Sequence, residues 1–117
     1  MKDFKSLLVW EKAHHLVLEI YKITAILPKE ENYGLTSQIR RATSSVPTNI
    51  AEGCGRGSDA DFKRFLQIAF GSASEVEYLL ILCKDLKYIN EDIYVNLNFK
   101  IEEIKKMLSA LIIKLRA

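Results

Sequence analysis

The sequence predicts an all-α protein that folds as an antiparallel, up-down-up-down four-helix bundle. Apolar residues recur every three or four positions along four segments, which is the period of one helical face. No segment alternates apolar and polar residues over the length of a strand. The connections between the segments are short, and short connections between long helices favour antiparallel neighbours.

The first helix is expected from about Ser6 to Leu27. Ser6 is a suitable N-cap, and Pro28 ends the helix because its ring disfavours α geometry at the residue before it. The predicted core face consists of the residues that repeat at helical spacing: Trp10, Ala13, Val17, Ile20, Thr24 and Leu27.

The second helix is expected from Leu35 or Thr36 to about Gly53, with Pro47 in its interior. Proline has no N–H to bond the carbonyl of Thr43, and its ring presses on that carbonyl. We therefore predict a kink at Pro47, with a break into two short helices as the alternative. The predicted core face comprises Ile39, Ala42 or Thr43, Val46 and Ile50.

The third and fourth helices carry their own capping signals. The glycines of residues 53–58 end the second helix and form a turn. Ser58, followed three residues later by Asp61, resembles a capping box and starts a third helix that runs to about Leu86. Asn90 is the predicted N-cap of the fourth helix. The predicted core faces comprise Phe62, Phe65, Leu66, Ala69, Ala73, Val76, Leu79, Leu80, Cys83 and Leu86 in the third helix, and Ile93, Leu97, Ile101, Ile104, Leu108, Leu111 and Leu115 in the fourth.

Length and composition set the class of protein. The 117 residues suffice for one domain, residues 1–117, and 49% apolar residues argue against disorder. The net charge of +2 excludes a strongly basic, histone-like protein. The chain has no signal-type apolar core near its N-terminus and no uncharged apolar run of about 18 residues, so we expect a cytoplasmic protein without a membrane partner.

No constellation of residues predicts an enzyme. The sequence has no phosphate-binding glycine loop, no nucleophile elbow and no pair of Glu-x-x-His motifs on two helices, as di-metal bundles require. Cys54 and Cys83 are expected to be reduced, inert thiols. The adjacent His14 and His15 point about 100° apart on a helix and do not chelate one metal. We predict no catalytic residue, no metal and no cofactor.

The apolar faces of the last two helices are wider than a monomeric bundle needs. This surplus favours self-association, with a wide core as the alternative. The residues outside the main stripes are Ile68, Phe70, Tyr78 and Ile81 in the third helix, and Tyr94, Met107, Ile112 and Ile113 in the fourth.

Residues 33–58 carry three arginines and one acid, a local charge of +2. Arg40 is expected to flank the apolar stripe of the second helix and Arg41 to face solvent. Lys63 and Arg64 follow in the third helix, close enough in a hairpin to extend a basic area with Arg56. Since the guanidinium fork suits phosphate oxygens, these five residues are the predicted nucleic-acid contacts.

The same segment has a purely structural interpretation. Gln38, Asn49 and Glu52 are predicted to organise the second helix, where the two amides satisfy backbone freed by Pro47 or join an interhelical network. The arginines serve intersubunit salt bridges in this alternative. The residue types and their spacing do not decide between the nucleic-acid and the structural interpretation.

Three stretches resemble a known family: LLVWEKAHHLVLEIYKIT, ILPKEENYGLTSQIRRATSSVPTNIAEGCGR and FKRFLQIAFGSASEVEYLL. They are similar to the four-helix bundle proteins encoded in intervening sequences of bacterial large-subunit ribosomal RNA genes, which are often labelled ribosomal-protein-like. The resemblance implies a cytoplasmic bacterial protein that forms a ring-like homopentamer. Relatives include the accessory variability determinant of diversity-generating retroelements, a basic pentamer that binds nucleic acid and a reverse transcriptase. The matching basic positions are Arg40, Arg41, Arg56, Lys63 and Arg64.

These observations predict a non-enzymatic homo-oligomer, a pentamer by resemblance, that binds RNA or DNA weakly through a basic patch. The alternative is a protein-interaction scaffold whose partner is another protein, such as a reverse transcriptase. An enzyme with a site between subunits is the third interpretation.

Overall fold

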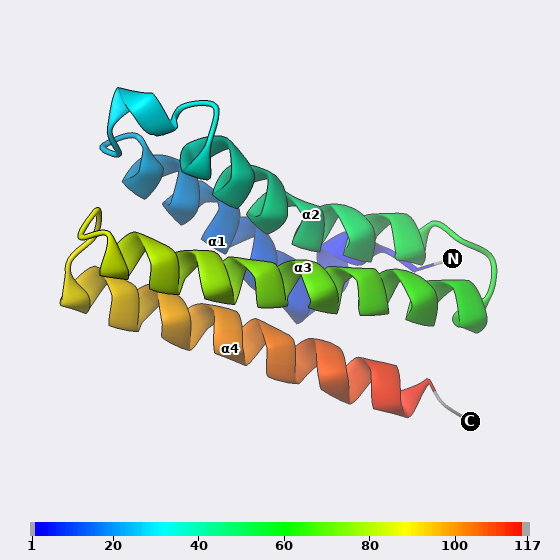
Figure 1. Cartoon of the computed structure of the whole chain (residues 1–117). Helices are drawn as coiled ribbons and strands as arrows, with labels where there is room; N and C mark the ends of the chain where they lie inside the picture. The colour runs from blue at the N-terminus through cyan, green and yellow to red at the C-terminus, as the bar shows by residue number, and fades with distance from the viewer. Residues whose placement is uncertain (1, 116–117) are drawn as a thin grey trace.

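The computed structural model describes residues 2–115, and within that range every regular element is a helix (Figure 1). The prediction of an all-α, four-helix fold is therefore confirmed. The helices are α1 (Leu8–Thr24), α2 (Leu35–Cys54), α3 (Asp59–Asp85) and α4 (Glu91–Lys114), with short 3₁₀ turns η1 (Phe4–Ser6) and η2 (Lys29–Glu31).

The four helices form an elongated bundle of 44 × 23 × 20 Å in which α2 packs on α1 and α3, and α4 packs on α3 and α1. Gln38, early in α2, contacts Glu75, just past the middle of α3, while Gly53, late in α2, lies against Phe62, early in α3. Successive helices thus run in opposite directions (Figure 1). The α2–α3 turn lies at one end of the bundle, and the α1–α2 connection and the α3–α4 turn lie at the other.

α1 is shorter than predicted at both ends. Ser6 is not its N-cap, because Ser6 lies in η1 and its hydroxyl donates to the carbonyl of Asp3 at 2.7 Å; Leu7 takes the N-cap position without a side-chain bond. α1 ends at Thr24 rather than Leu27, and the Thr24 hydroxyl donates to the carbonyl of Ile20 at 2.6 Å. α1 thus ends four residues before Pro28, so the proline is not what ends the helix.

The predicted caps of the later helices are confirmed. The Ser58 hydroxyl accepts the backbone N–H of Asp61 at 3.1 Å, and the side-chain oxygen of Asn90 accepts that of Ile93 at 2.8 Å. These bonds satisfy N–H groups that a helix start otherwise leaves free. The predicted burial of Leu86 is wrong, because this residue caps the C-terminus of α3 and is 47% exposed.

α2 continues without interruption through Pro47, so a break into two short helices is wrong. The proline is itself buried. A kink at Pro47 stays a prediction. The hydroxyls of Ser44 and Ser45 bond the Arg41 carbonyl and the Ser72 hydroxyl, respectively.

Most predicted core residues of α2, α3 and α4 are buried, and their apolar faces meet along the bundle axis. The predicted face of α1 is rotated from the observed one, because Val9 and Leu16 are buried while Trp10 and Val17 are only half-buried. Both half-buried side chains turn toward α2, where they line a surface groove.

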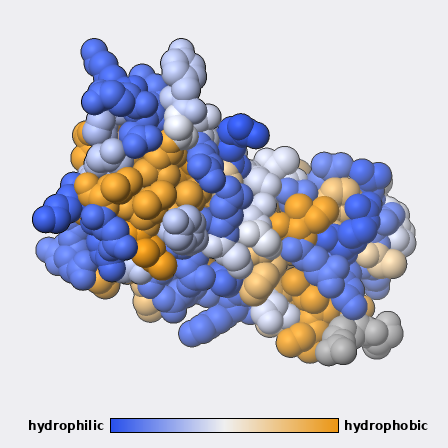
Figure 2. All heavy atoms as spheres, viewed as in Figure 1, coloured by the Kyte–Doolittle hydropathy of each residue, from blue (hydrophilic) through white to orange (hydrophobic). Residues whose placement is uncertain are grey.

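The predicted surplus of apolar surface is present in part. Tyr78 and Ile113 are 58% and 60% exposed, and Ile68 is also exposed. The other five predicted residues are half-buried. Figure 2 shows an apolar area over the later half of α3, beside the first turns of α2.

α3 is long and apolar enough, by length and composition alone, to cross a membrane. Its apolar residues, however, pack against α2 and α4, and Glu75 and Glu77 in its middle contact Gln38 and Lys105 of those helices. We read α3 as the central core helix of the bundle.

The two cysteines provide a test of the core. Burial raises the pKa of the Cys83 thiol to about 11, with a further contribution from Glu31, and burial also raises the pKa of Cys54. Little thiolate is therefore present at pH 8, and the thiols are inaccessible. We expect both to react with a disulfide reagent at least roughly 100-fold more slowly in the native protein than in denaturant. A fast phase from either thiol in the native protein would contradict this packing.

Candidate nucleic-acid interface

The five predicted basic residues fall into two groups rather than one patch. Arg40 and Arg41 lie in the first half of α2, and Arg56, Lys63 and Arg64 lie around the α2–α3 turn. From Arg41 to Arg56 the chain advances roughly 22 Å at the helical rise of 1.5 Å per residue. One phosphate group therefore does not contact both groups.

The α2–α3 turn is tight because Gly53 allows close helix packing. A Cβ atom at this position would lie 2.9 Å from Cβ of Phe65 and 3.1 Å from Cδ1 of Phe62. Such distances are below normal carbon–carbon contact. The absence of a side chain thus brings the end of α2 against the first turns of α3.

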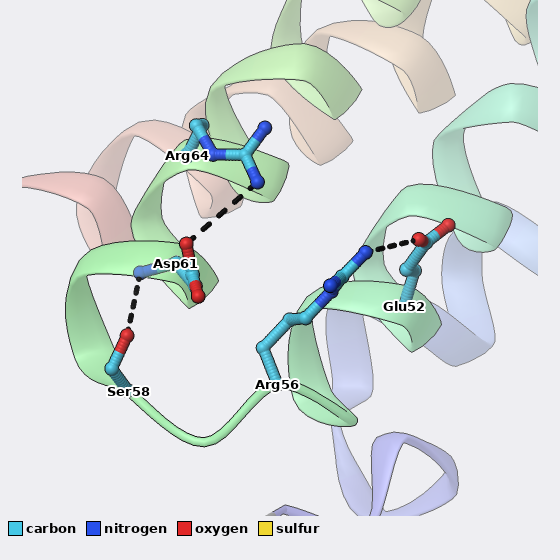
Figure 3. Close-up of polar contacts among 5 residues, drawn as sticks. All are labelled: Glu52, Arg56, Ser58, Asp61 and Arg64. Atoms are coloured by element: carbon cyan, nitrogen blue, oxygen red, sulfur yellow. Dashed lines mark hydrogen bonds and ion pairs between the residues drawn. The ribbon is translucent and has the colours of Figure 1, made fainter.

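Arg56 and Arg64 both lie against the ring of Phe65. Their guanidinium carbons are 4.9 and 4.6 Å from its centroid, within the range of cation–π attraction. Figure 3 shows Arg56 directed toward Glu52 and Arg64 toward Asp61; the shortest distances are 2.8 and 3.7 Å. Each contact involves Nη2, so the fork of each arginine keeps further donors for an incoming phosphate.

Carboxylates reduce the positive charge around the α2–α3 turn. Lys2 reaches Asp59 at 3.4 Å and lies 4.9 Å from the centroid of Phe62. The side chains of all three acid–base pairs are largely exposed, and pairs of this kind contribute little stability and exchange partners readily. The cluster has a net charge of +1; its members are Lys2, Glu52, Arg56, Asp59, Asp61, Lys63 and Arg64. We call these seven residues the basic turn.

Arg40 is part of the α1–α2 contact. Its Nε donates to the Thr24 hydroxyl at 2.9 Å and its Nη2 donates to the Tyr21 carbonyl at 3.2 Å. The guanidinium carbon lies 4.6 Å from the centroid of the Tyr21 ring. Arg40 therefore bonds the C-terminal turn of α1, where a cation is electrostatically favourable.

The two adjacent arginines of α2 are expected to differ in stability effect. Arg40→Ala removes two charge-assisted hydrogen bonds and should lower the free energy of unfolding by about 1–2 kcal/mol. Arg41→Ala changes an exposed side chain and should stay within about 0.5 kcal/mol of wild type. Urea denaturation followed by circular dichroism measures both. Equal stabilities of the two variants would contradict the structural role of Arg40.

Arg41 lines a polar groove of about 550 Å³ between α2 and α3. There, Gln38 Nε2 donates to Glu75 at 3.3 Å, and the hydroxyls of Ser45 and Ser72 are 2.9 Å apart. Asn49 Nδ2 donates to the carbonyl and the hydroxyl of Ser45 at 2.8 and 2.9 Å. The amides predicted to organise α2 thus lie in an interhelical network.

A second groove, of about 400 Å³, runs between α1 and α2 and was not predicted. We call it the aromatic groove. Its lining is Phe4, Trp10, His14, Val17, Ser44, Pro47, Thr48 and Ala51. The sequence signal for this groove is the spacing of four residues between Trp10 and His14, which places both rings on one face of α1. The apolar periodicity instead assigned Trp10 to the core.

Metal chemistry finds no support in the described part of the chain, where no group of three or more His, Cys, Asp or Glu side chains is placed to hold an ion.

The comparisons with known proteins agree with this architecture. The chain matches the 23S rRNA-intervening sequence protein family over residues 5–110. It is also similar to the crystal structure of a protein of unknown function from the S23 ribosomal protein family of Bacteroides thetaiotaomicron, with 31% identity, 90% of this chain and 98% of that chain covered, and a TM-score of 0.81. No curated protein matches the chain. The resemblance identified from the sequence is confirmed.

Proposed function

Because the chain belongs to the 23S rRNA-intervening sequence protein family, we propose that it is a non-enzymatic cytoplasmic bundle that self-associates and binds RNA or DNA weakly. Binding is to backbone phosphates and has little sequence preference. The basic turn is the contact region, with Arg56, Lys63 and Arg64 as the phosphate ligands. Arg41 adds a separate, weaker contact.

The observation that carries this proposal is the pair of arginines on Phe65. Stacking on one buried ring fixes the position of both guanidinium groups, so less side-chain entropy is lost when they bind a phosphate. Their carboxylate partners are exposed and are exchanged for phosphate oxygens at little cost. Arginine contacts of this type position nucleic acid without reading its sequence.

Self-association supports binding by a weakly charged chain. A charge of +2 per subunit becomes about +10 in the pentamer that the family resemblance implies, and several weak contacts on one ring raise avidity. Exposed apolar side chains are numerous at the end of the bundle opposite the basic turn, including Ile26 and Tyr33 of the α1–α2 connection. Contact between subunits through these residues leaves the basic turn accessible.

Fluorescence anisotropy of a labelled structured RNA and a matched DNA duplex tests the proposal. We expect both to bind with similar affinity, with a dissociation constant on the order of 10⁻⁴ to 10⁻⁶ M at physiological salt and a steep loss of affinity as salt rises. Light scattering on the same samples gives the subunit number. Absence of binding at low salt would contradict the nucleic-acid role.

The second candidate is a protein-interaction scaffold. It is favoured by a wholly apolar groove of about 280 Å³ between the start of α1 and the end of α4, lined by Leu7, Leu8, Val9, Met107, Ala110 and Leu111. Exposed apolar surface of this kind is typical of protein contacts. Binding of a protein partner by a chain that fails to bind nucleic acid would favour this candidate.

A further inference from the structure

The aromatic groove combines parallel rings with hydroxyl groups. The rings of Trp10 and His14 are stacked, with centroids 5.2 Å apart and an interplanar angle of 7°. The ring of Phe4 meets Trp10 edge-on at 5.0 Å. The opposite wall, from α2, presents the side chains of Ser44 and Thr48. Aromatic planes beside hydroxyl groups suit a flat heterocycle that also forms hydrogen bonds.

Charge distinguishes this groove from the other polar grooves of the molecule. Its lining contains no carboxylate. Three other grooves are lined by charged or amide side chains, and each of them includes at least one carboxylate. These carboxylates are Glu75 in the groove with Arg41, Glu77 and Glu102 in a groove between α3 and α4, and Glu11, Glu19 and Glu103 in a groove between α1 and α4. Cations stand near its two ends: Lys5 Nζ lies 5.9 Å from the Phe4 ring, and Arg40 lies over Tyr21, one helical turn beyond Val17. Such a groove favours an anionic ligand over a cationic peptide.

The aromatic groove ends near the basic turn. Its lining ends at Ala51, next to Glu52 and within five residues of Arg56. On the other wall, Phe4 follows Lys2, whose backbone N–H donates to the Cys54 carbonyl at 3.1 Å. From Trp10 to Val17 the α1 wall extends roughly 10 Å, which is room for about three stacked bases at about 3.4 Å each.

From this arrangement we infer that the aromatic groove stacks unpaired bases of a single-stranded nucleic acid whose phosphates lie at the basic turn. The inference rests on the proposed nucleic-acid function and adds a substrate class to it. Trp10 and His14 provide the stacking surface, and Ser44 and Thr48 provide hydrogen bonds to base edges. A duplex, whose bases are already stacked, contacts the phosphate ligands alone.

The test uses Trp10, the only tryptophan of the chain, as the probe. The full chain is titrated with a single-stranded RNA of roughly ten nucleotides, within the range of known single-strand site sizes, and with a blunt duplex of the same length. We expect the single strand to quench Trp10 fluorescence and the duplex to bind, by anisotropy, without quenching. Trp10→Leu should lower affinity for the single strand roughly five- to hundredfold and leave duplex affinity unchanged.

Two further variants keep the result interpretable. His14→Ala tests the same stack at a half-buried position if Trp10→Leu fails to fold. Phe99→Leu removes an exposed ring from α4 and should leave both affinities unchanged.

Each contrary outcome has a distinct meaning. If both oligonucleotides bind without quenching and Trp10→Leu binds like wild type, the groove is not the base site and the proposed function stands. If neither oligonucleotide binds, the proposed function fails and the inference fails with it. If Trp10 fluorescence changes on dilution without nucleic acid, a second copy of the chain occupies the groove, which also overturns the inference.

Discussion

Gly53→Ala is expected to destabilise the protein by about 1–3 kcal/mol, the cost of overfilling a close-packed contact. The added Cβ atom would lie 2.9 Å from Cβ of Phe65, and neither atom is the end of a flexible side chain. Relief therefore requires α2 and α3 to move apart at the turn. Because Phe65 supports Arg56 and Arg64, the same variant should also weaken nucleic-acid binding.

Gly71→Ala is the matched control. Gly71 is exposed in the middle of α3, and a Cβ atom there meets nothing within 4 Å. Since glycine costs a helix interior roughly 0.5–1 kcal/mol relative to alanine, this variant should be stabilised by about that amount. Urea denaturation of both variants gives the comparison. Gly53→Ala with the stability of wild type would show that the helices do not approach as closely as described.

Charge reversal at the basic turn is expected to weaken nucleic-acid binding on the order of ten- to hundredfold at low salt. The double variant Lys63→Glu, Arg64→Glu removes two phosphate ligands and adds repulsion. Acidic residues are tolerated in the first turns of a helix, so the fold should persist. The slope of log affinity against log salt should also become less steep by roughly 1.8, or 0.9 for each lost phosphate contact with duplex DNA.

A second double variant controls for net charge. Lys22→Glu, Lys29→Glu makes the same charge change at the opposite end of the bundle, where both lysines are exposed. Its affinity should decrease less than threefold because its charges lie more than a Debye length of about 10 Å from the basic turn. Equal losses in the two double variants would indicate a response to overall charge rather than a site.

The sequence was sufficient to predict the four helices but not the buried face of each one. Capping at Ser58 and Asn90 is local chemistry, so short-range patterns identify it. The predicted face of α1 was rotated because Trp10 is apolar enough to fit a core pattern, whereas in the structure its ring lines a groove and stacks with His14. Periodicity does not distinguish a core position from the wall of a groove.

The roles of the basic residues depend on contacts across helices. Adjacent positions in the sequence gave Arg40 and Arg41 the same expected role, yet Thr24 and Tyr21 of α1 engage only Arg40. The charge count of residues 33–58 ended before Asp59 and Asp61 of α3, which reduce the charge of the turn. That Phe65 supports two arginines follows from the tight turn and has no signature in sequence spacing.

Amide chemical-shift mapping with ¹⁵N-labelled protein and unlabelled RNA tests the central claim, nucleic-acid binding at the basic turn, most directly. Shifts are predicted for residues 52–64, together with the indole N–H of Trp10 when the RNA is single-stranded, and not for residues 22–34 at the opposite end. Binding accompanied by shifts at residues 22–34 and none at 52–64 would contradict the claim.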